Sequence, residues 1–338
     1  MTKQKIFVVA KLLLGGILIT VLISAVNIDD LLSRFHSINI GYLAIVFLLP
    51  HIAMLLSTVK WQLLLRALRI QVALKRLFGL YMVGTFFSNF LPTMVGGDVV
   101  RSYTLYRETG DGSGVTAAIF LERFLGLTAL ISFLPLVIFE ERVSNAIPML
   151  SLFVIGITAT YALMLALTVS PVFEYLGEFK PKLNIVKKVW NFAGKTHSNI
   201  RRFGRFKSPL LKSYVISLAF YLVTVATTWT AAKSLGVGVD YLYLLAIVPL
   251  VLLAAIAPIS LNGLGITEAG YVIFLQIFGV GLEDALAIAL LLRFRLVITA
   301  LIGGLIFLWY RSQPGRMVMP DQENTDAKLS PRSEQPVD

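Results

Sequence analysis

Long apolar stretches separated by short polar segments dominate the pattern along this chain. A helix needs roughly 20 residues to cross about 30 Å of hydrocarbon. Stretches of about that length lie at residues 6–26, 40–59, 119–139, 147–169, 214–232 and 285–310. None of them alternates apolar and polar residues with a period of two, which argues against a transmembrane barrel. The pattern predicts an all-α polytopic membrane protein with about six full spans. The first stretch is expected to be retained, because no small-residue cleavage site follows it.

Two shorter apolar stretches, 77–91 and 241–257, each end at a break rich in proline and glycine. The breaks contain Pro92, Gly96 and Gly97 in LPTMVGGD, and Pro258, Gly263 and Gly265 in APISLNGLGITE. In a membrane, such a break frees backbone polar groups that must find partners inside the protein. We therefore expect these residues to form the tips of two broken re-entrant hairpins.

Basic residues indicate which loops face the cytoplasm, because lysine and arginine gather on that side. They are Lys3, Lys5, Lys11, Lys60, Arg66, Arg69, Lys75, Arg76, many residues of 180–212, Arg311 and Arg316. The loops between them carry Asp29, Asp30, Glu140, Glu141, Asp240, Glu283 and Asp284. Both termini are then cytoplasmic, in the cell (inner) membrane.

By this assignment of the loops, the two flanks of each broken stretch lie on the same side of the membrane. The first stretch would enter from the cytoplasm and return there, and the second would enter from outside and return outside. Broken helices at corresponding places in two halves, entered from opposite faces, indicate an inverted repeat with a site at the midplane. Ten full spans with the same loop sides are the alternative.

Composition supports a membrane protein and excludes several kinds of chemistry. Of the 338 residues, 57% are hydrophobic and only 14% are charged, and the mean hydropathy is +0.80. The chain has no cysteine, and its three histidines lie far apart, so no metal site or cofactor is expected. No GxxxxGK[ST] motif occurs, which argues against direct use of ATP.

Two polar regions complete the organisation of the chain. A basic loop at 174–212, with aromatic residues interleaved, is expected either to bind anionic lipids of the inner leaflet or to act only as a topology signal. Nucleic-acid binding is not expected of it. Residues 1–310 form the predicted transmembrane domain, and the polar segment 311–338 is predicted to be a disordered cytoplasmic tail.

Charged residues inside apolar segments are the candidate site, because burying a charge in the bilayer costs about 3 kcal/mol even on lenient scales. They are Asp98, Arg101, Glu122, Arg123, Glu268, Arg293 and Arg295. Asp98 and Arg101 share a helical face, whereas the adjacent Glu122 and Arg123 splay apart by about 100°. Arg293 and Arg295 differ by about 200°, so one of them is expected to be structural.

Structural roles compete with functional ones at several of these positions. Asp98 and Glu268 suit helix capping after the breaks, and Glu122 with Arg123 suits an internal ion pair. Taken together, four arginines and two inward-pointing helix N-termini would give a cavity suited to phosphate.

Three segments resemble a known family. They are NFLPTMVGGDVVRSYTLYRETG at 89–110, ERFLGL at 122–127 and APISLNGLGITEAG at 257–270. They are similar to motifs of the lysylphosphatidylglycerol synthase transmembrane-region family, the flippase-like domain of multiple peptide resistance factors. The resemblance covers roughly residues 1–310. It implies that Asp98, Arg101, Glu122, Arg123 and Glu268 occupy the family's polar positions, and that a phospholipid or lipid-linked headgroup moves between leaflets.

A flippase for an anionic or phosphate-bearing lipid is therefore the leading hypothesis. One alternative is a membrane enzyme that transfers a glycosyl or aminoacyl group to a lipid, with a carboxylate as acid or base. Another is a scaffold for a lipid or envelope biosynthetic enzyme. Lysyl transfer is not expected, because only the short polar tail follows the membrane region.

Overall fold

Helices make up all the regular structure that can be described. The computed structural model describes residues 3–90, 96–169, 207–256 and 260–312, and every regular element in these ranges is a helix. Polar caps fix several helix starts: the side chains of Asn27, Asn39 and Asp111 accept hydrogen bonds from backbone amides of the first turn that follows. Such caps satisfy amides that have no partner inside the helix. The predicted all-α fold is confirmed.

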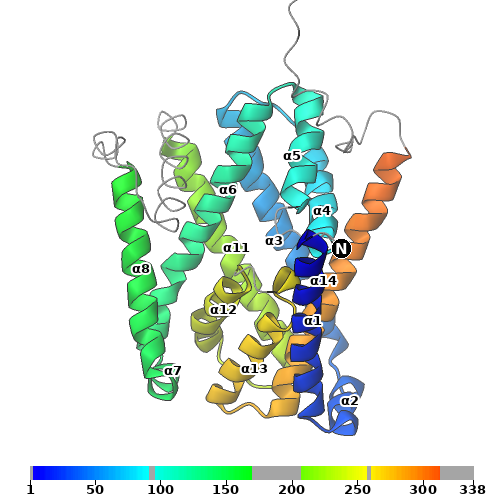
Figure 1. Cartoon of the computed structure of the whole chain (residues 1–338), viewed down its shortest axis with the longest axis vertical. Coiled ribbons are helices and arrows are strands. Elements are labelled where there is room, and N and C mark those ends of the chain that lie inside the picture. Colours follow the sequence, from blue (N-terminus) through cyan, green and yellow to red (C-terminus); the bar gives the residue numbers. More distant parts are fainter. Residues whose placement is uncertain (1–2, 91–95, 170–206, 257–259, 313–338) are drawn as a thin grey trace, which may run out of the picture.

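Five long apolar helices within the described residues can cross a membrane (Figure 1). They are α3 (Ile40–Ala67), α6 (Gly112–Phe133) continued by the 3-10 helix η1 (Leu134–Phe139), α8 (Pro148–Val169), α11 (Lys207–Ser234) and α14 (Leu282–Arg311). A short helix α7 (Glu141–Ala146) connects η1 to α8. These spans match five of the predicted stretches, and most extend beyond them because polar residues continue the helices past the apolar core.

The first predicted span corresponds to a bent pair of helices. Helix α1 (Lys3–Ser24) is followed by α2 (Ile28–His36), and the chain turns by 88° between them. Asn27 caps α2, and two aspartates occupy its first turn, where negative charge is favourable. Figure 1 shows α1 beginning near mid-height of the molecule, so the cytoplasmic position of the N-terminus stays a prediction.

Two helical hairpins approach each other from opposite ends of the molecule (Figure 1). The first consists of α4 (Leu74–Phe90) and α5 (Gly96–Thr109). The second consists of α12 (Tyr241–Ile256), the short 3-10 helix η3 (Leu261–Gly263) and α13 (Ile266–Phe278). Their legs have 17, 14, 16 and 13 residues, or roughly 20 to 25 Å at 1.5 Å per residue. Legs this short favour hairpins over the ten-span alternative.

The two halves of the chain form an inverted repeat. Helices α3 and α11 both have 28 residues, and each is followed by a hairpin and then a long helix. Contacts match between the halves: α4 packs on α14 as α12 packs on α6, and α5 packs on α6 as α13 packs on α14. Figure 1 shows the corresponding helices running in opposite directions. One large cluster of buried apolar side chains lies within α3 to α6, and a second joins α11 to α14 to residues of α3, α6, η1, α7 and α8.

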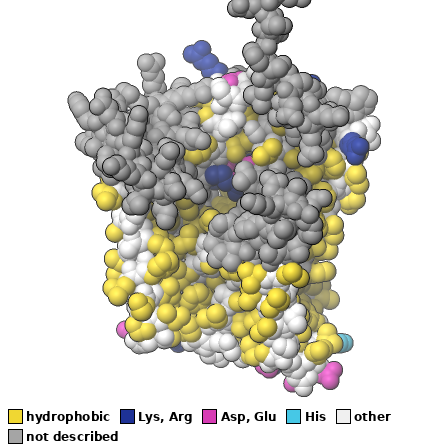
Figure 2. All heavy atoms as spheres, viewed as in Figure 1, with side chains coloured by type: hydrophobic (Ala, Val, Ile, Leu, Met, Phe, Trp, Pro, Cys, Tyr) yellow, Lys and Arg dark blue, Asp and Glu magenta, His cyan; other side chains and the backbone are white. Residues whose placement is uncertain are grey.

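The outer surface suits a lipid environment. Large apolar side chains of α8 are exposed, including Met149, Leu152 and Phe153, and this helix is almost unburied along its apolar window. Figure 2 shows hydrophobic side chains across the middle and lower part of one face, with acidic side chains at its lower end. An apolar surface of this extent would favour aggregation in water, whereas the hydrocarbon of a bilayer solvates it.

Some predicted features fall outside the described residues. They are Pro92, Pro258, most of the basic loop at 174–212 and nearly all of the tail at 311–338. Within the described part, Lys207 and Lys212 belong to the first turns of α11, so the end of the predicted loop is helical. Helix α14 ends at Arg311.

Gly96 and Gly97, which are predicted at a hairpin tip, lie where the return leg of the first hairpin begins. They are the first two residues of α5 and both are buried. A Cβ at Gly97 would overlap the backbone carbonyl oxygen of Gly84 on α4. The glycine is therefore needed because the two legs of the hairpin approach closely.

We expect Gly97→Ala to destabilise the protein by about 1 to 3 kcal/mol, because the added methyl must push the legs apart. The thermal unfolding midpoint in detergent, followed by tryptophan fluorescence, measures the effect. Gly156→Ala in α8 is the matched control, since nothing lies within 4 Å of a Cβ there. Equal midpoints for the two variants would contradict the close packing of α4 on α5.

Candidate functional site between the hairpin tips

Asp98 lies where the first hairpin turns back. It is the third residue of α5, and its carboxylate lies 2.8 Å from Nη2 of Arg101 and 2.8 Å from Nη2 of Arg123 on α6. A second bond from Nε of Arg123 makes that pair bidentate. Asp98 therefore holds α5 to α6 through side-chain ion pairs, and its position in the first turn differs from the N-cap considered for it.

Glu122 is buried beside this pair and is bound from two helices. Its carboxylate lies 2.9 Å from Nη2 of Arg101, and both side chains are only 2% exposed. The hydroxyl of Tyr81 on α4 donates to Glu122 over 2.9 Å. The predicted pairing of Glu122 with Arg123 is wrong: the two splay apart on α6, and each pairs with a residue of α5.

The guanidinium of Arg101 is also enclosed by aromatic rings. It lies 4.8 Å from the ring centre of Trp61 and 4.6 Å from that of Tyr81. Aromatic faces attract cations, most strongly when water is excluded. These contacts, together with Asp98 and Glu122, fix the orientation of a buried charge.

Lys60 corrects the sequence interpretation, which counted it among the cytoplasmic loop residues. Helix α3 continues to Ala67, so Lys60 lies inside the helix, is 5% exposed, and donates to Ser217 of α11 over 3.1 Å. The apolar run ends before Lys60, but the helix does not. The lysine therefore ties the central helices of the two halves together.

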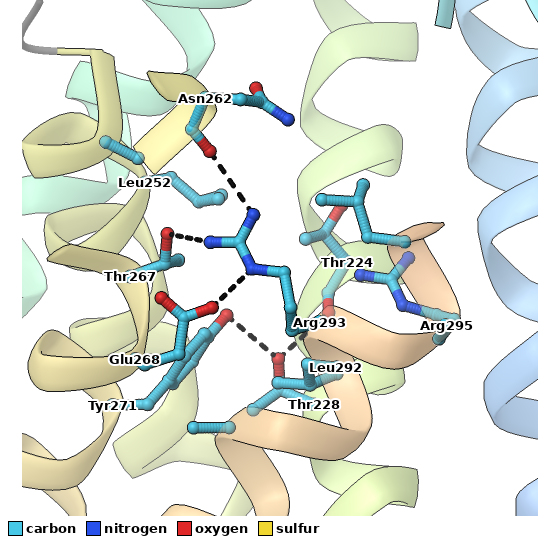
Figure 3. Close-up of a pocket in the computed structure, with 13 residues that line it drawn as sticks. Thr224, Thr228, Leu252, Asn262, Thr267, Glu268, Tyr271, Leu292, Arg293 and Arg295 are labelled. Carbon is cyan, nitrogen blue, oxygen red and sulfur yellow. Dashed lines mark hydrogen bonds and ion pairs between the residues drawn. The ribbon is translucent and has the colours of Figure 1, made fainter. Parts of the chain in front are cut away.

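The second hairpin carries the corresponding ion pair (Figure 3). Nε of Arg293 on α14 donates to Glu268, the third residue of α13. Arg293 also donates to the backbone oxygens of Asn262 and Gly263 and to the hydroxyl of Thr267, over 3.1 to 3.4 Å. Arg293 thus holds the hairpin tip in place, as expected of one of the two arginines on α14.

Glu268 has the capping role considered for it. Its Oε2 accepts a hydrogen bond of 2.7 Å from the amide of Gly265 at the start of α13. Gly263 and Gly265 have φ values of 69° and 80°, which glycine adopts without steric cost. Both glycines lie in the connection between α12 and α13. The carboxylate therefore joins tip, helix and Arg293 in one unit.

The two ion pairs occupy the same register in the inverted halves. Asp98 and Glu268 are the third residues of α5 and α13, and Arg123 and Arg293 are the twelfth residues of α6 and α14. The partners are 25 residues apart in each case. Twelve residues place each arginine about 16 Å along its helix, near the middle of a bilayer.

The two hairpins meet at two asparagines. Nδ2 of Asn262, in the second hairpin, donates to Oδ1 of Asn89, near the end of α4, over 2.5 Å. Asn262 has a left-handed φ of 47°, a conformation that asparagine tolerates better than most residues. The two halves therefore touch through polar side chains, one near the end of α4 and one in the irregular backbone of the second hairpin.

A cavity of about 420 Å³ lies at this meeting point. Its polar lining consists of Tyr81, Thr85, Ser88, Asp98, Arg101, Arg123, Thr224, Thr227, Asn262, Arg295 and Thr299. We call it the central cavity. Three arginines face one aspartate there, so the lining is net positive. A volume of this size falls within the range of small-ligand sites.

A smaller pocket of about 210 Å³ shares part of the lining of the central cavity (Figure 3). Arg293 and Arg295 both line it, so the two do contribute to one pocket despite their i, i+2 spacing. Their partners differ completely. Arg293 is bound on all sides, whereas Arg295 forms no ion pair with a residue that the structure describes, and its buried Nε has no hydrogen-bond partner there.

Several lining residues were not identified from the sequence. Thr224, Thr227 and Thr228 of α11 line one or both cavities, and their i, i+3, i+4 spacing places them on one helical face. That spacing was a usable signal inside an otherwise apolar span. Asn89 and Asn262 gave no comparable signal, because their contact depends on how the hairpins dock.

Comparison with known proteins identifies the family of this chain. The sequence profile of the lysylphosphatidylglycerol synthase TM region matches residues 8–304. A UPF0104 membrane protein of Pyrococcus horikoshii is 23% identical over 326 residues, covering 88% of this chain and 95% of the relative. One from Methanocaldococcus jannaschii is 20% identical, covering 83% and 88%. No solved structure matches the chain. This protein therefore belongs to the lysylphosphatidylglycerol synthase transmembrane-region family.

Proposed function

We propose that this protein is a flippase that moves an anionic or phosphate-bearing lipid, or a lipid-linked headgroup, between the leaflets of the cell membrane without using ATP. The observation that carries the proposal is Arg295, which lines a cavity between two inverted hairpins, has a buried Nε without a hydrogen-bond partner, and forms no ion pair with the residues that the structure describes. Transporters built from inverted repeats place their substrate sites at such a meeting point. Membership of a family named for a lipid synthase supports a lipid substrate.

A phosphate group is the ligand that suits this cavity best. An unpaired cation in low dielectric is costly, and a phosphate would neutralise Arg295 while accepting its free donors in a forked geometry. Hydroxyls of Thr224, Thr227 and Thr299 lie in the same lining and would complete the contacts. The apolar part of the lipid would remain in the bilayer.

The transferase alternative has less support from the geometry. A general acid or base needs a carboxylate that can exchange a proton with the substrate. Asp98, Glu122 and Glu268 are each paired with an arginine, which engages the carboxylate oxygens that would have to exchange a proton. Their arrangement fits structural and gating roles better than proton transfer.

Arg295→Gln is the test of the proposed function. Proteoliposomes containing fluorescent phosphatidylglycerol, with a membrane-impermeant quencher outside, report movement between leaflets. We expect Arg295→Gln to slow movement by at least about tenfold, because a hydrogen bond to a charged group contributes about 1.5 to 3 kcal/mol. Unfolding of this variant should be close to that of the unmodified protein, since no ion pair of the described residues is lost.

Arg34→Gln serves as the matched control. Arg34 forms an ion pair with Asp284 at the far end of the molecule, and its side chain is 44% exposed. The control should transport normally. Transport by Arg295→Gln at the control rate would remove Arg295 from the substrate path, and no transport of any phosphate-bearing lipid by the unmodified protein would overturn the proposal.

A further inference from the structure

A groove on the side of the molecule leads toward the central cavity. It has a volume of about 520 Å³ and lies between α5 and α6. Its lining consists of Asp98, Val99, Ser102, Tyr103, Tyr106, Gly112, Thr116, Ile119, Phe120 and Arg123. We call it the lateral groove. The lining is mainly apolar, with hydroxyls along it and the Asp98–Arg123 ion pair at its deep end.

The lateral groove and the central cavity share one pair of residues. Asp98 and Arg123 line both spaces, so their bidentate ion pair lies between them. The side chain of Arg123 is 56% exposed even though it pairs with Asp98, which is 12% exposed. A group in the groove can therefore reach Arg123 directly, and must pass this pair to reach Arg295.

The equivalent place in the second half of the chain is closed. By the register of the ion pairs, Ser102 and Thr116 correspond to Val272 on α13 and Leu286 on α14. Val272 is 3% exposed and Leu286 is 1% exposed, whereas Thr116 is exposed on the surface. The ion pair there is also covered, with Glu268 at 2% and Arg293 at 15%. One repeat is thus open to the side and the other is packed shut.

We propose that the lateral groove is the entry site for one lipid molecule from the leaflet at the α5–α6 turn, with its phosphate at Arg123 and its first acyl carbons against Val99, Ile119 and Phe120. The inference rests on the proposed function, and it adds the route by which the lipid enters and the leaflet from which it comes. Charge and position select the occupant: the groove places an accessible guanidinium about 16 Å below the start of α6. Apolar walls beside a cation match a lipid with an anionic headgroup.

A reversible disulfide across the groove tests this site. The hydroxyl oxygens of Ser102 and Thr116 lie 3.5 Å apart, so cysteines there can reach the sulfur–sulfur distance of about 2.05 Å with little movement. The chain has no native cysteine. S144C/S151C is the matched control, because those hydroxyls lie 3.1 Å apart at the distant α7–α8 connection.

Oxidised S102C/T116C should move fluorescent phosphatidylglycerol at close to the protein-free rate, and reduction should restore movement in the same sample. The oxidised control should match its reduced form. Thr116→Trp, which fills the groove without a crosslink, should also block movement if the disulfide forms incompletely. Equal movement before and after a complete crosslink would overturn the proposed entry route.

A binding measurement separates this inference from the proposed function. Phosphatidylglycerol with a diazirine in one acyl chain should label the peptides of 99–120 in the reduced S102C/T116C protein, and much less after oxidation. Labelling there equal to that of the lipid-facing α8, or unchanged by oxidation, would overturn the groove site. Labelling as expected without any transport would retain the groove and reject the flippase.

Discussion

Arg293→Gln is expected to destabilise the protein by about 3 to 5 kcal/mol, because it leaves the carboxylate of Glu268 buried without its counter-charge. The same change removes the donors to Asn262, Gly263 and Thr267 that hold the second hairpin tip. The substitution therefore removes the ion pair and the hydrogen bonds to the hairpin tip at the same time. Thermal unfolding in detergent, followed by tryptophan fluorescence, measures the loss.

Two further variants distinguish charge from packing at this position. Arg293→Lys keeps the positive charge, but a lysine lacks the planar fork that reaches both the carboxylate and the carbonyls. Its stability should therefore lie between that of the unmodified protein and that of Arg293→Gln. Glu268→Gln combined with Arg293→Gln removes the unpaired charge and should recover part of the stability of Arg293→Gln alone. If the double variant is less stable than the single one, the buried carboxylate is not the main cost.

Arg101→Met should be similarly damaging in the first half of the chain, at about 3 to 5 kcal/mol. The substitution leaves Glu122, which is 2% exposed, with Tyr81 as its remaining side-chain partner among the described residues. It also removes the cation between the rings of Trp61 and Tyr81. Chemical or thermal unfolding of the purified protein reports this cost.

Arg123→Met is the matched control for Arg101→Met, since both arginines bind Asp98. The side chain of Arg123 is 56% exposed, so its loss should cost less stability than the loss of Arg101, which is 2% exposed. Asp98 keeps Arg101 as a partner in this variant. If Arg123→Met loses as much stability as Arg101→Met, the exposure of an arginine side chain does not predict how much it stabilises the protein.

The two kinds of experiment address different parts of the site. Stability variants concern Arg101 and Arg293, which pair with buried carboxylates, whereas transport variants concern Arg295, which has no ion-pair partner among the described residues. A charge enclosed by buried partners, as in Arg101 and Arg293, is not free to bind a passing phosphate, whereas the exposed guanidinium of Arg123 keeps one side open to the lateral groove. The structure separates these roles among four arginines that the sequence presented as one group.

The sequence by itself determined the helical membrane fold, the hairpin breaks and the set of intramembrane charges. These features depend on local properties: the length of apolar runs, the effect of proline and glycine on a helix, and the cost of a charge in hydrocarbon. They could therefore be predicted without contacts between distant residues. The corresponding motifs in the two halves also indicated the inverted repeat before the helices could be compared.

Only the tertiary structure decided which charge binds which. Arg293 and Arg295 are two residues apart, yet one anchors a hairpin tip and the other lines the central cavity without an ion-pair partner among the described residues. Glu122 and Arg123 are adjacent, yet they bind different residues of α5. Lys60 resembled a loop residue but joins α3 to α11. Partner choice depends on which helical faces meet when the two halves pack, and no local pattern in the chain specifies that packing.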